Sequence, residues 1–164
     1  MKPLTTVLLC LALAVPAAAQ TATEPALPNQ WAGAGVFFNQ YASPQINGTA
    51  AYAKKILGSG TYNFNAVNFL SYETQPFRVM TTVETGIAQR VTRFGAFEVF
   101  ALGTLGPATA GDEDGTKLGV AFTGGGFAFA GLGKGWTIGP VLRVTKPTIS
   151  DTQWAIGLMV GWGE

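Results

Sequence analysis

Histidine is absent from this 164-residue sequence, and cysteine occurs once, at Cys10. Without histidine the chain lacks the usual general base of hydrolytic active sites. Charged residues are only 12% of the chain, against about 25% in a typical soluble domain, and this scarcity of lysine and arginine argues against nucleic-acid binding. Beyond the N-terminal segment no apolar run approaches the roughly 18 residues of a membrane-spanning helix, so none is predicted.

The first 19 residues have the pattern of a secretory signal peptide. Lys2 supplies the early positive charge, an apolar run follows, and Ala17-Ala18-Ala19 supplies the small residues before a predicted cleavage at Gln20. Cys10 follows Leu9 inside the run rather than a small residue at its end, so we expect no lipid attachment and no cysteine in the mature chain. Residues 20–30 carry two prolines and no apolar period, which predicts a disordered lead-in to a domain at 31–164.

From residue 31 onward, alternating or apolar segments are separated by turn signals, and none has a helical period. The sequence therefore predicts an all-β fold of eight strands. The expected ranges are 31–42, 48–57, 61–73, 77–91, 95–105, 117–132, 135–146 and 153–163. Tight connections such as 58–60 and 133–135 alternate with longer ones, of which 106–116 is the longest. An eight-stranded antiparallel up-and-down barrel with one smooth end and one looped end has this alternation.

The two faces of the later strands differ in composition. One face of the last strand carries Trp154, Ile156, Leu158, Val160 and Trp162, and the other is mostly glycine and alanine. The small, bland residues are a poor water-facing surface, but they suit the interior of a narrow barrel. We therefore expect the large apolar residues to face outward into hydrocarbon, as in a transmembrane β-barrel.

Aromatic residues gather near the ends of the predicted strands. Rings of amphipathic aromatics about one strand length apart are typical of the two interfaces of a membrane. We expect such girdles at the smooth end from Trp31, Tyr62, Trp136 and Trp162, and at the looped end from Tyr41, Tyr72 and Trp154.

A small set of charges is predicted to face the lumen, where it must pair or meet water. It comprises Arg78, Glu84, Arg90, Glu98 and Arg143. A turn near residue 94 would place Arg90 directly opposite Glu98. The set could form a polar gate or an internal salt-bridge network that fills the lumen; the second interpretation is favoured because an eight-stranded barrel has little open interior.

The signal peptide, the strand count, the loop asymmetry and the two-residue period together resemble the small eight-stranded outer-membrane β-barrels of Gram-negative bacteria, the OmpA/OmpX-like kind. The resemblance covers about residues 31–164. It implies export to the bacterial outer membrane, contact with outer-membrane lipid, and handling by the barrel-assembly machinery during biogenesis. Members of that family usually end in an aromatic residue, whereas this chain ends Trp162-Gly163-Glu164.

Two functional hypotheses follow. The first is a non-enzymatic, porin-like outer-membrane barrel of the cell envelope, with a structural or surface-contact role and narrow passage of very small solutes. The alternative is a soluble periplasmic, lipocalin-like barrel that binds an apolar ligand. A lipid-acting enzyme is disfavoured by the missing histidine, and no cofactor or metal is expected, because "GDEDG" at 111–115 lacks the later glutamate of a calcium loop. The oligomeric state is left open.

Overall fold

The computed structural model describes residues 27–164 apart from 40–46, 58–59, 75–76 and 113–114, and gives the backbone alone for residues 57, 72–74, 77–78 and 112. The predicted signal peptide lies outside the described residues. So do Tyr41 and the side chains of Tyr72 and Arg78, and the predictions made for them stay predictions. Where the chain is described, no helix is long and apolar enough to cross a membrane.

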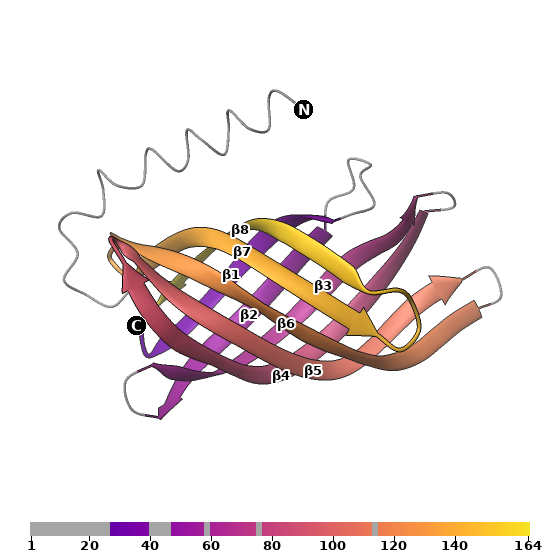
Figure 1. Cartoon of the computed structure of the whole chain (residues 1–164), viewed down its shortest axis with the longest axis horizontal. Coiled ribbons are helices and arrows are strands. Elements are labelled where there is room, and N and C mark those ends of the chain that lie inside the picture. The colour runs from indigo at the N-terminus through magenta and orange to yellow at the C-terminus, as the bar shows by residue number, and fades with distance from the viewer. Residues whose placement is uncertain (1–26, 40–46, 58–59, 75–76, 113–114) are drawn as a thin grey trace, which may run out of the picture.

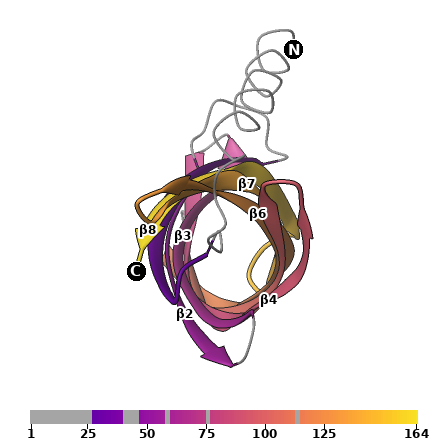
Figure 2. The ribbon, with the colours of Figure 1, turned by 90° about the vertical axis from the view of Figure 1, so that its left-hand side faces the viewer.

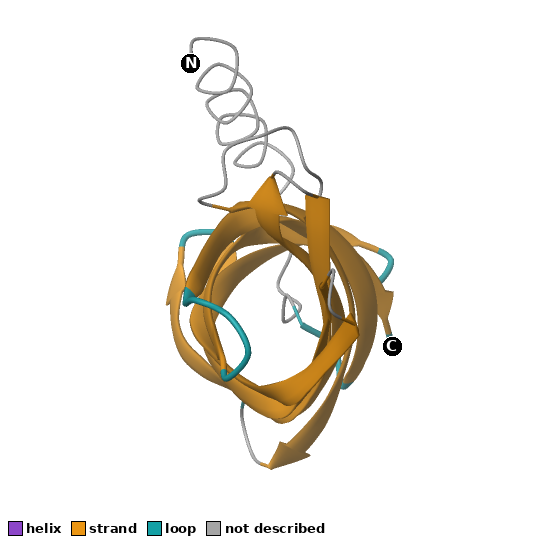
Figure 3. Cartoon of the chain, turned by 90° about the vertical axis from the view of Figure 1, so that its right-hand side faces the viewer, coloured by secondary structure: helices purple, strands orange, loops and turns teal. Residues whose placement is uncertain are grey.

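Eight antiparallel strands close into a barrel in which each strand pairs with its neighbours in sequence and β1 pairs with β8. The strands are β1 Gln30–Asn39, β2 Asn47–Leu57, β3 Thr61–Thr74, β4 Phe77–Phe94, β5 Phe97–Asp112, β6 Gly115–Gly133, β7 Trp136–Pro147 and β8 Gln153–Gly163. Figure 1 shows the barrel from the side, and the end-on views in Figures 2 and 3 show the closed ring of strands. The predicted eight-stranded up-and-down barrel is confirmed.

The connection between β6 and β7 shows why one end of the barrel is smooth. Lys134 and Gly135 have φ angles of 52° and 78°, the two positive values that a type I′ hairpin requires. Such a turn joins two strands with no protruding loop.

The prediction that residues 106–116 form the longest connection is wrong. β5 continues to Asp112 and β6 begins at Gly115, and pairs such as Thr109 with Leu118 extend the barrel wall toward the looped end. The segment does alternate, because Ala108 and Ala110 are buried while Thr109 is exposed. Its small inward residues and Pro107 concealed the period from sequence inspection.

The large apolar residues of β4, β7 and β8 face outward, as predicted. Val83 and Ile87 of β4 are 53% and 52% exposed, and Leu142 of β7 is 53% exposed. In β7 the burial pattern alternates strictly along most of the strand, with Thr137, Val141 and Arg143 inside. These strands present an aliphatic wall to the surroundings.

The same expectation is wrong for five aromatic residues of the other strands. Trp31 of β1 and Tyr62 and Phe64 of β3 are buried inside the barrel, as are Phe100 of β5 and Phe127 of β6. The physical reason is volume: an eight-stranded barrel has an interior that side chains must fill. Because β1 and β8 contribute glycines to the lumen, other inward positions have to supply large side chains.

Trp31 shows how closely small and large residues are matched. A Cβ atom added to Gly161 would lie 2.2 Å from Cε2 of Trp31, and one added to Gly33 would lie 2.4 Å from Cζ2 of the same ring. No side chain larger than hydrogen fits beside the indole at these two positions. Gly33 of β1 and Gly161 of β8 therefore leave the space that the Trp31 ring occupies.

We predict that Gly161→Ala lowers the free energy of unfolding by about 1–3 kcal/mol, because the new methyl group overpacks the ring of Trp31. Gly124→Ala is the matched control, since Gly124 lies on the exposed outer face and a Cβ there meets nothing within 4 Å. Denaturant titration followed by tryptophan fluorescence measures both. Equal stability of the two variants would contradict the account of the packing.

Candidate functional site: the barrel interior

The half of the lumen nearest the smooth end is filled by aromatic side chains from four strands, β1, β3, β5 and β6. This aromatic layer consists of Trp31, Tyr62, Phe64, Phe100, Phe127 and Phe129, all buried. Each lies close in sequence to the smooth end of its strand, so the barrel closure brings the rings to one level.

The rings of the aromatic layer are in mutual contact across the lumen. The centroids of Phe100 and Phe127 are 4.9 Å apart and stacked, and Phe127 lies 4.9 Å from Phe129. Tyr62 meets Phe100 edge-on at 5.8 Å. These separations are those of favourable aromatic pairs, so the layer forms one continuous apolar cluster inside the barrel.

The two polar atoms in this layer have hydrogen-bond partners. Nε1 of Trp31 donates to Oγ1 of Thr137 at 2.8 Å, and the hydroxyl of Tyr62 donates to the carbonyl oxygen of Leu27 at 2.9 Å. Leu27 itself is 1% exposed. The lead-in predicted to be disordered over 20–30 is therefore ordered from Leu27 onward, because Leu27 packs into the core and Gln30 begins β1.

The ion pair between Arg90 and Glu98 lies at the same end, beside Tyr62. Nη1 of Arg90 is 3.3 Å from Oε1 of Glu98. The sequence predicted that the two residues lie directly opposite each other, and this is wrong. The register shifts between Arg90 and Thr92, so that Arg90 pairs with Phe100. The length of the arginine side chain restores the contact across this bulge.

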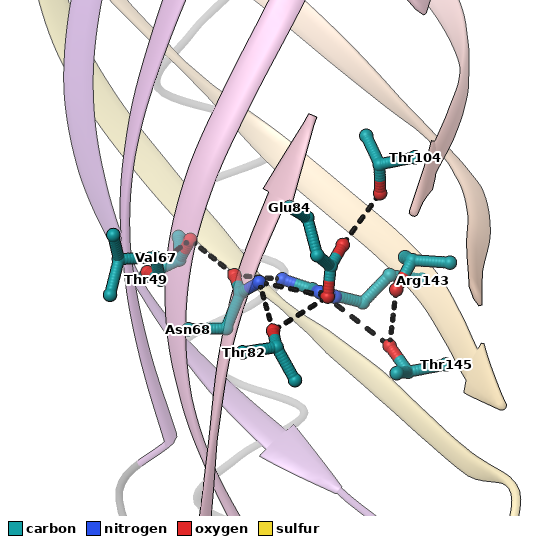
Figure 4. A network of polar contacts seen from close by, with 9 residues as sticks. Thr49, Val67, Asn68, Thr82, Glu84, Thr104, Arg143 and Thr145 are labelled. Carbon is teal, nitrogen blue, oxygen red and sulfur yellow. Dashed lines mark hydrogen bonds and ion pairs between the residues drawn. The ribbon is translucent and has the colours of Figure 1, made fainter. Parts of the chain in front are cut away.

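A second, polar layer lies in the lumen on the looped-end side of the aromatic layer. It consists of Asn68, Thr82, Glu84, Thr104, Arg143 and Thr145, which are all buried. Figure 4 shows these side chains pointing toward one another from β3, β4, β5 and β7.

Glu84 is the centre of the polar layer. Its Oε1 accepts hydrogen bonds from Oγ1 of Thr82 at 2.6 Å and from Nδ2 of Asn68 at 3.1 Å, and its Oε2 accepts one from Oγ1 of Thr104 at 2.5 Å. Nη2 of Arg143 lies 3.3 Å from Oε1 and completes an ion pair. A buried carboxylate is stable only with such compensation.

Arg143 reaches across the barrel from β7 to meet these groups. Its Nη1 donates to Oδ1 of Asn68, and its guanidinium carbon lies 5.7 Å from the centroid of the Phe37 ring. Asn68 therefore binds both charged partners, with its amide NH₂ on the carboxylate and its carbonyl oxygen on the guanidinium. The Nε of Arg143 has no hydrogen-bond partner among the described residues.

The structure brings four of the five predicted lumen charges into two separate pairs, Glu84 with Arg143 and Arg90 with Glu98. The side chain of Arg78 is not described. Sequence reasoning missed Asn68 and the threonines around Glu84. The available signal was parity, because Asn68 shares its face of β3 with Tyr62 and Phe64.

The predicted interface aromatics divide into two groups. Trp136, Trp154 and Trp162 are 50%, 48% and 43% exposed on the outer wall, and Trp136 and Trp162 are paired neighbours near the smooth end. The girdle prediction is wrong for Trp31 and Tyr62, because their side chains belong to the aromatic layer inside the barrel.

The interior can do little chemistry in this arrangement. Both oxygens of Glu84 are engaged by hydrogen bonds and the ion pair, which leaves the carboxylate poorly placed to act as a general base. Among the described residues no group of three or more acidic, histidine or cysteine side chains is placed to hold a metal ion. The geometry is that of a structural network.

We predict that Arg143→Met lowers the free energy of unfolding by about 3–5 kcal/mol, because it leaves the buried Glu84 carboxylate without its cation. Lys146→Met is the matched control, since it removes a positive charge from the exposed face of the same strand. The double variant Glu84→Gln/Arg143→Met should recover part of the loss in the same denaturant titration. If Arg143→Met were as mild as Lys146→Met, the network would have no structural role.

No protein-family model matches this sequence, and no curated protein matches it. Several solved structures match the fold of this chain. The N-terminal β-barrel domain of OprF from Pseudomonas aeruginosa aligns with a TM-score of 0.53 at 13% identity, over 82% of this chain and 96% of that one. The outer membrane enzyme PagL aligns with a TM-score of 0.50 at 10% identity, over 82% of this chain and 99% of that one. At these identities the similarity shows the fold alone, and the predicted likeness to small outer-membrane β-barrels is confirmed as a likeness of fold.

Proposed function

We propose that this chain is a non-enzymatic β-barrel of the bacterial outer membrane, with a structural or surface-contact role in the cell envelope. The observation that carries the proposal is the outer wall of β7 and β8. Between Trp136 and Trp154 it is aliphatic, with Leu142, Ile156 and Val160 each more than 40% exposed. Water does not favour a continuous apolar wall of this kind, whereas acyl chains do.

The positions of the exposed tryptophans support the same environment. Trp136 and Trp162 lie near the smooth end and Trp154 near the looped end of the same two strands. Amphipathic indole rings at both borders of an aliphatic band are typical of the two interfaces of a membrane. The indole Nε1 of Trp162 donates to the backbone oxygen of Lys134 at 3.0 Å, in the turn below the band.

The soluble, ligand-binding alternative receives less support. An apolar ligand inside the barrel would have to occupy the region that the aromatic layer fills with rings in contact. The other half contains the polar layer, with its hydrogen-bonded ion pair, and a buried apolar cluster that includes Leu70 and Met80. The same two layers lead us to propose that the barrel does not conduct, although the sequence left narrow passage of very small solutes open.

The proposal of a non-enzymatic role rests on the chemistry of the interior groups. The sequence offers no histidine, and the carboxylate of Glu84 is already engaged by Thr82, Asn68, Thr104 and Arg143. PagL is described as an outer membrane enzyme, but a shared fold carries no activity from one barrel to another.

Cell fractionation with an unheated and a heated denaturing gel tests the proposal. We expect the protein to sediment with membranes, to require detergent for extraction and to migrate faster when unheated, because a closed barrel without boiling stays compact. In planar bilayers we expect no conductance above background. Release by osmotic shock in soluble form would contradict the membrane assignment, and a steady conductance would contradict the closed interior.

A further inference from the structure

The outer wall of the barrel is uneven, and its polar part lies on the strands opposite β7 and β8 in the strand order. On β8 the outward residues from Trp154 to Trp162 are all apolar. On β3 and β4 the outward positions include a polar stripe, which consists of Thr61, Asn63 and Asn65 of β3 and Thr85 and Gln89 of β4. These five residues are half-buried or exposed, while their neighbours in sequence on β3 point into the lumen.

The residues of the polar stripe are hydrogen-bonded to one another across the β3–β4 pair. Nδ2 of Asn65 donates to Oδ1 of Asn63 at 2.6 Å, and Oγ1 of Thr85 donates to Oδ1 of Asn65 at 2.9 Å. Oγ1 of Thr61 donates to Oε1 of Gln89 at 2.5 Å. The stripe therefore consists of two hydrogen-bonded groups, Asn63 with Asn65 and Thr85, and Thr61 with Gln89. The exposed side chain of Ile87 lies between Thr85 and Gln89 on β4.

The part of the polar stripe formed by Asn65 and Thr85 lies among outward apolar residues of β3 and β4. Toward the looped end it is followed by Phe69 and Val83, which are 51% and 53% exposed. Toward the smooth end β4 continues with Val91, which is 63% exposed. On that side β3 begins at Thr61, and the exposed Lys54 of β2 pairs with Asn63. If the outward apolar residues face acyl chains, as proposed above, then Asn65 and Thr85 lie at membrane depth. This inference rests on that proposed function.

The hydrogen bonds within the stripe do not use all of its side-chain N–H donors. An asparagine amide has two N–H bonds. Asn65 uses one of its two to bind Asn63. The bonds within the stripe use neither N–H bond of Asn63. Hydrocarbon cannot bind these groups, and an unsatisfied polar group in hydrocarbon is strongly unfavourable. A polar partner at the same depth removes that penalty.

We propose that the polar stripe is the interface through which two copies of this chain form a dimer within the membrane. Carboxamide groups both donate and accept, so a patch of asparagine, glutamine and threonine is complementary to itself. A twofold axis brings the same patch of both copies together. All five residues of the stripe are uncharged, so the pairing needs no charged partner of another kind.

The wall next to the stripe has room for close approach. A hollow of 640 Å³ opens on the outer surface of β2–β5, with Ala50 and Asn65 among its lining residues and Val83 and Leu105 beside them. Small residues allow neighbouring membrane segments to come close. Lys54, which pairs with Asn63 across β2 and β3, is long enough to extend its ammonium group toward the smooth end.

Disulfide crosslinking in membranes tests the dimer. In a Cys10→Ser background, which removes the only cysteine of the chain, Thr85→Cys places a thiol in the stripe opposite Asn65. Val160→Cys is the matched control on the outer face of β8. With copper phenanthroline as oxidant we expect a crosslinked dimer from Thr85→Cys and none from Val160→Cys. Absence of the dimer, or equal crosslinking from both positions, would overturn the proposal.

A second measurement separates polar pairing from apolar contact. The double variant Asn63→Val/Asn65→Val should raise the dimer dissociation constant about tenfold or more, measured by sedimentation in mild detergent. Ile156→Ala/Val160→Ala should leave it unchanged. If the unsubstituted protein sediments as a monomer, with lipid bound where the second copy is expected, the dimer is overturned.

The failure of this inference is distinguishable from failure of the proposed function. Each variant is first checked on the unheated gel and in the membrane fraction. A compact, membrane-bound protein that never crosslinks through Thr85→Cys refutes the dimer and leaves the membrane barrel intact. A protein absent from the membrane fraction refutes both.

Discussion

The width of the lumen is the constraint on which the rest of this structure depends. Eight strands enclose a space that side chains just fill, so the size of each inward residue limits the size of those opposite. Gly33 and Gly161 leave the room that Trp31 occupies. The rings of Phe100 and Phe127 fill the remainder of that level. The large inward residues of some strands are thus matched by small inward residues of other strands.

The same constraint shapes the polar half of the interior and the outer wall. Any charge enclosed in the lumen must find its partners there, and Glu84 does so through Arg143, Asn68 and the surrounding threonines. Because side chains alternate along a strand, the inward placement of Tyr62, Phe64 and Asn68 forces Asn63 and Asn65 outward. The polar stripe on the outer face of β3 is therefore a consequence of what the lumen requires from this strand.

Much of the fold could be predicted from the sequence, since turn signals and two-residue alternation are local properties. They gave eight strands, and in β4, β7 and β8 they also gave the correct inward face, where one face is plainly aliphatic. They failed for β3, where both faces carry large residues. Which face of β3 is inside depends on the glycines of β1 and β8, and this dependence is not visible within β3 itself.

The site was predictable only in part for the same reason. Glu84 and Arg143 were recognisable as inward charges from the parity of their own strands. Their contact is a product of barrel closure, which brings β4 and β7 across from each other, and no local pattern encodes that distance. The bulge between Arg90 and Thr92 likewise shifted the expected pairing with Glu98. Asn68 was missed because it interrupts an apolar row.

The measurement that tests the central claim most directly is the quenching of single tryptophans by brominated lipid. The chain has four tryptophans, and variants that each retain one of them can be folded into vesicles. The account predicts strong quenching of Trp136, Trp154 and Trp162 by bromine in the acyl chains and little quenching of Trp31, which lies inside. Quenching of Trp31 as strong as that of Trp154, or outer tryptophans reached only by a water-soluble quencher, would contradict it.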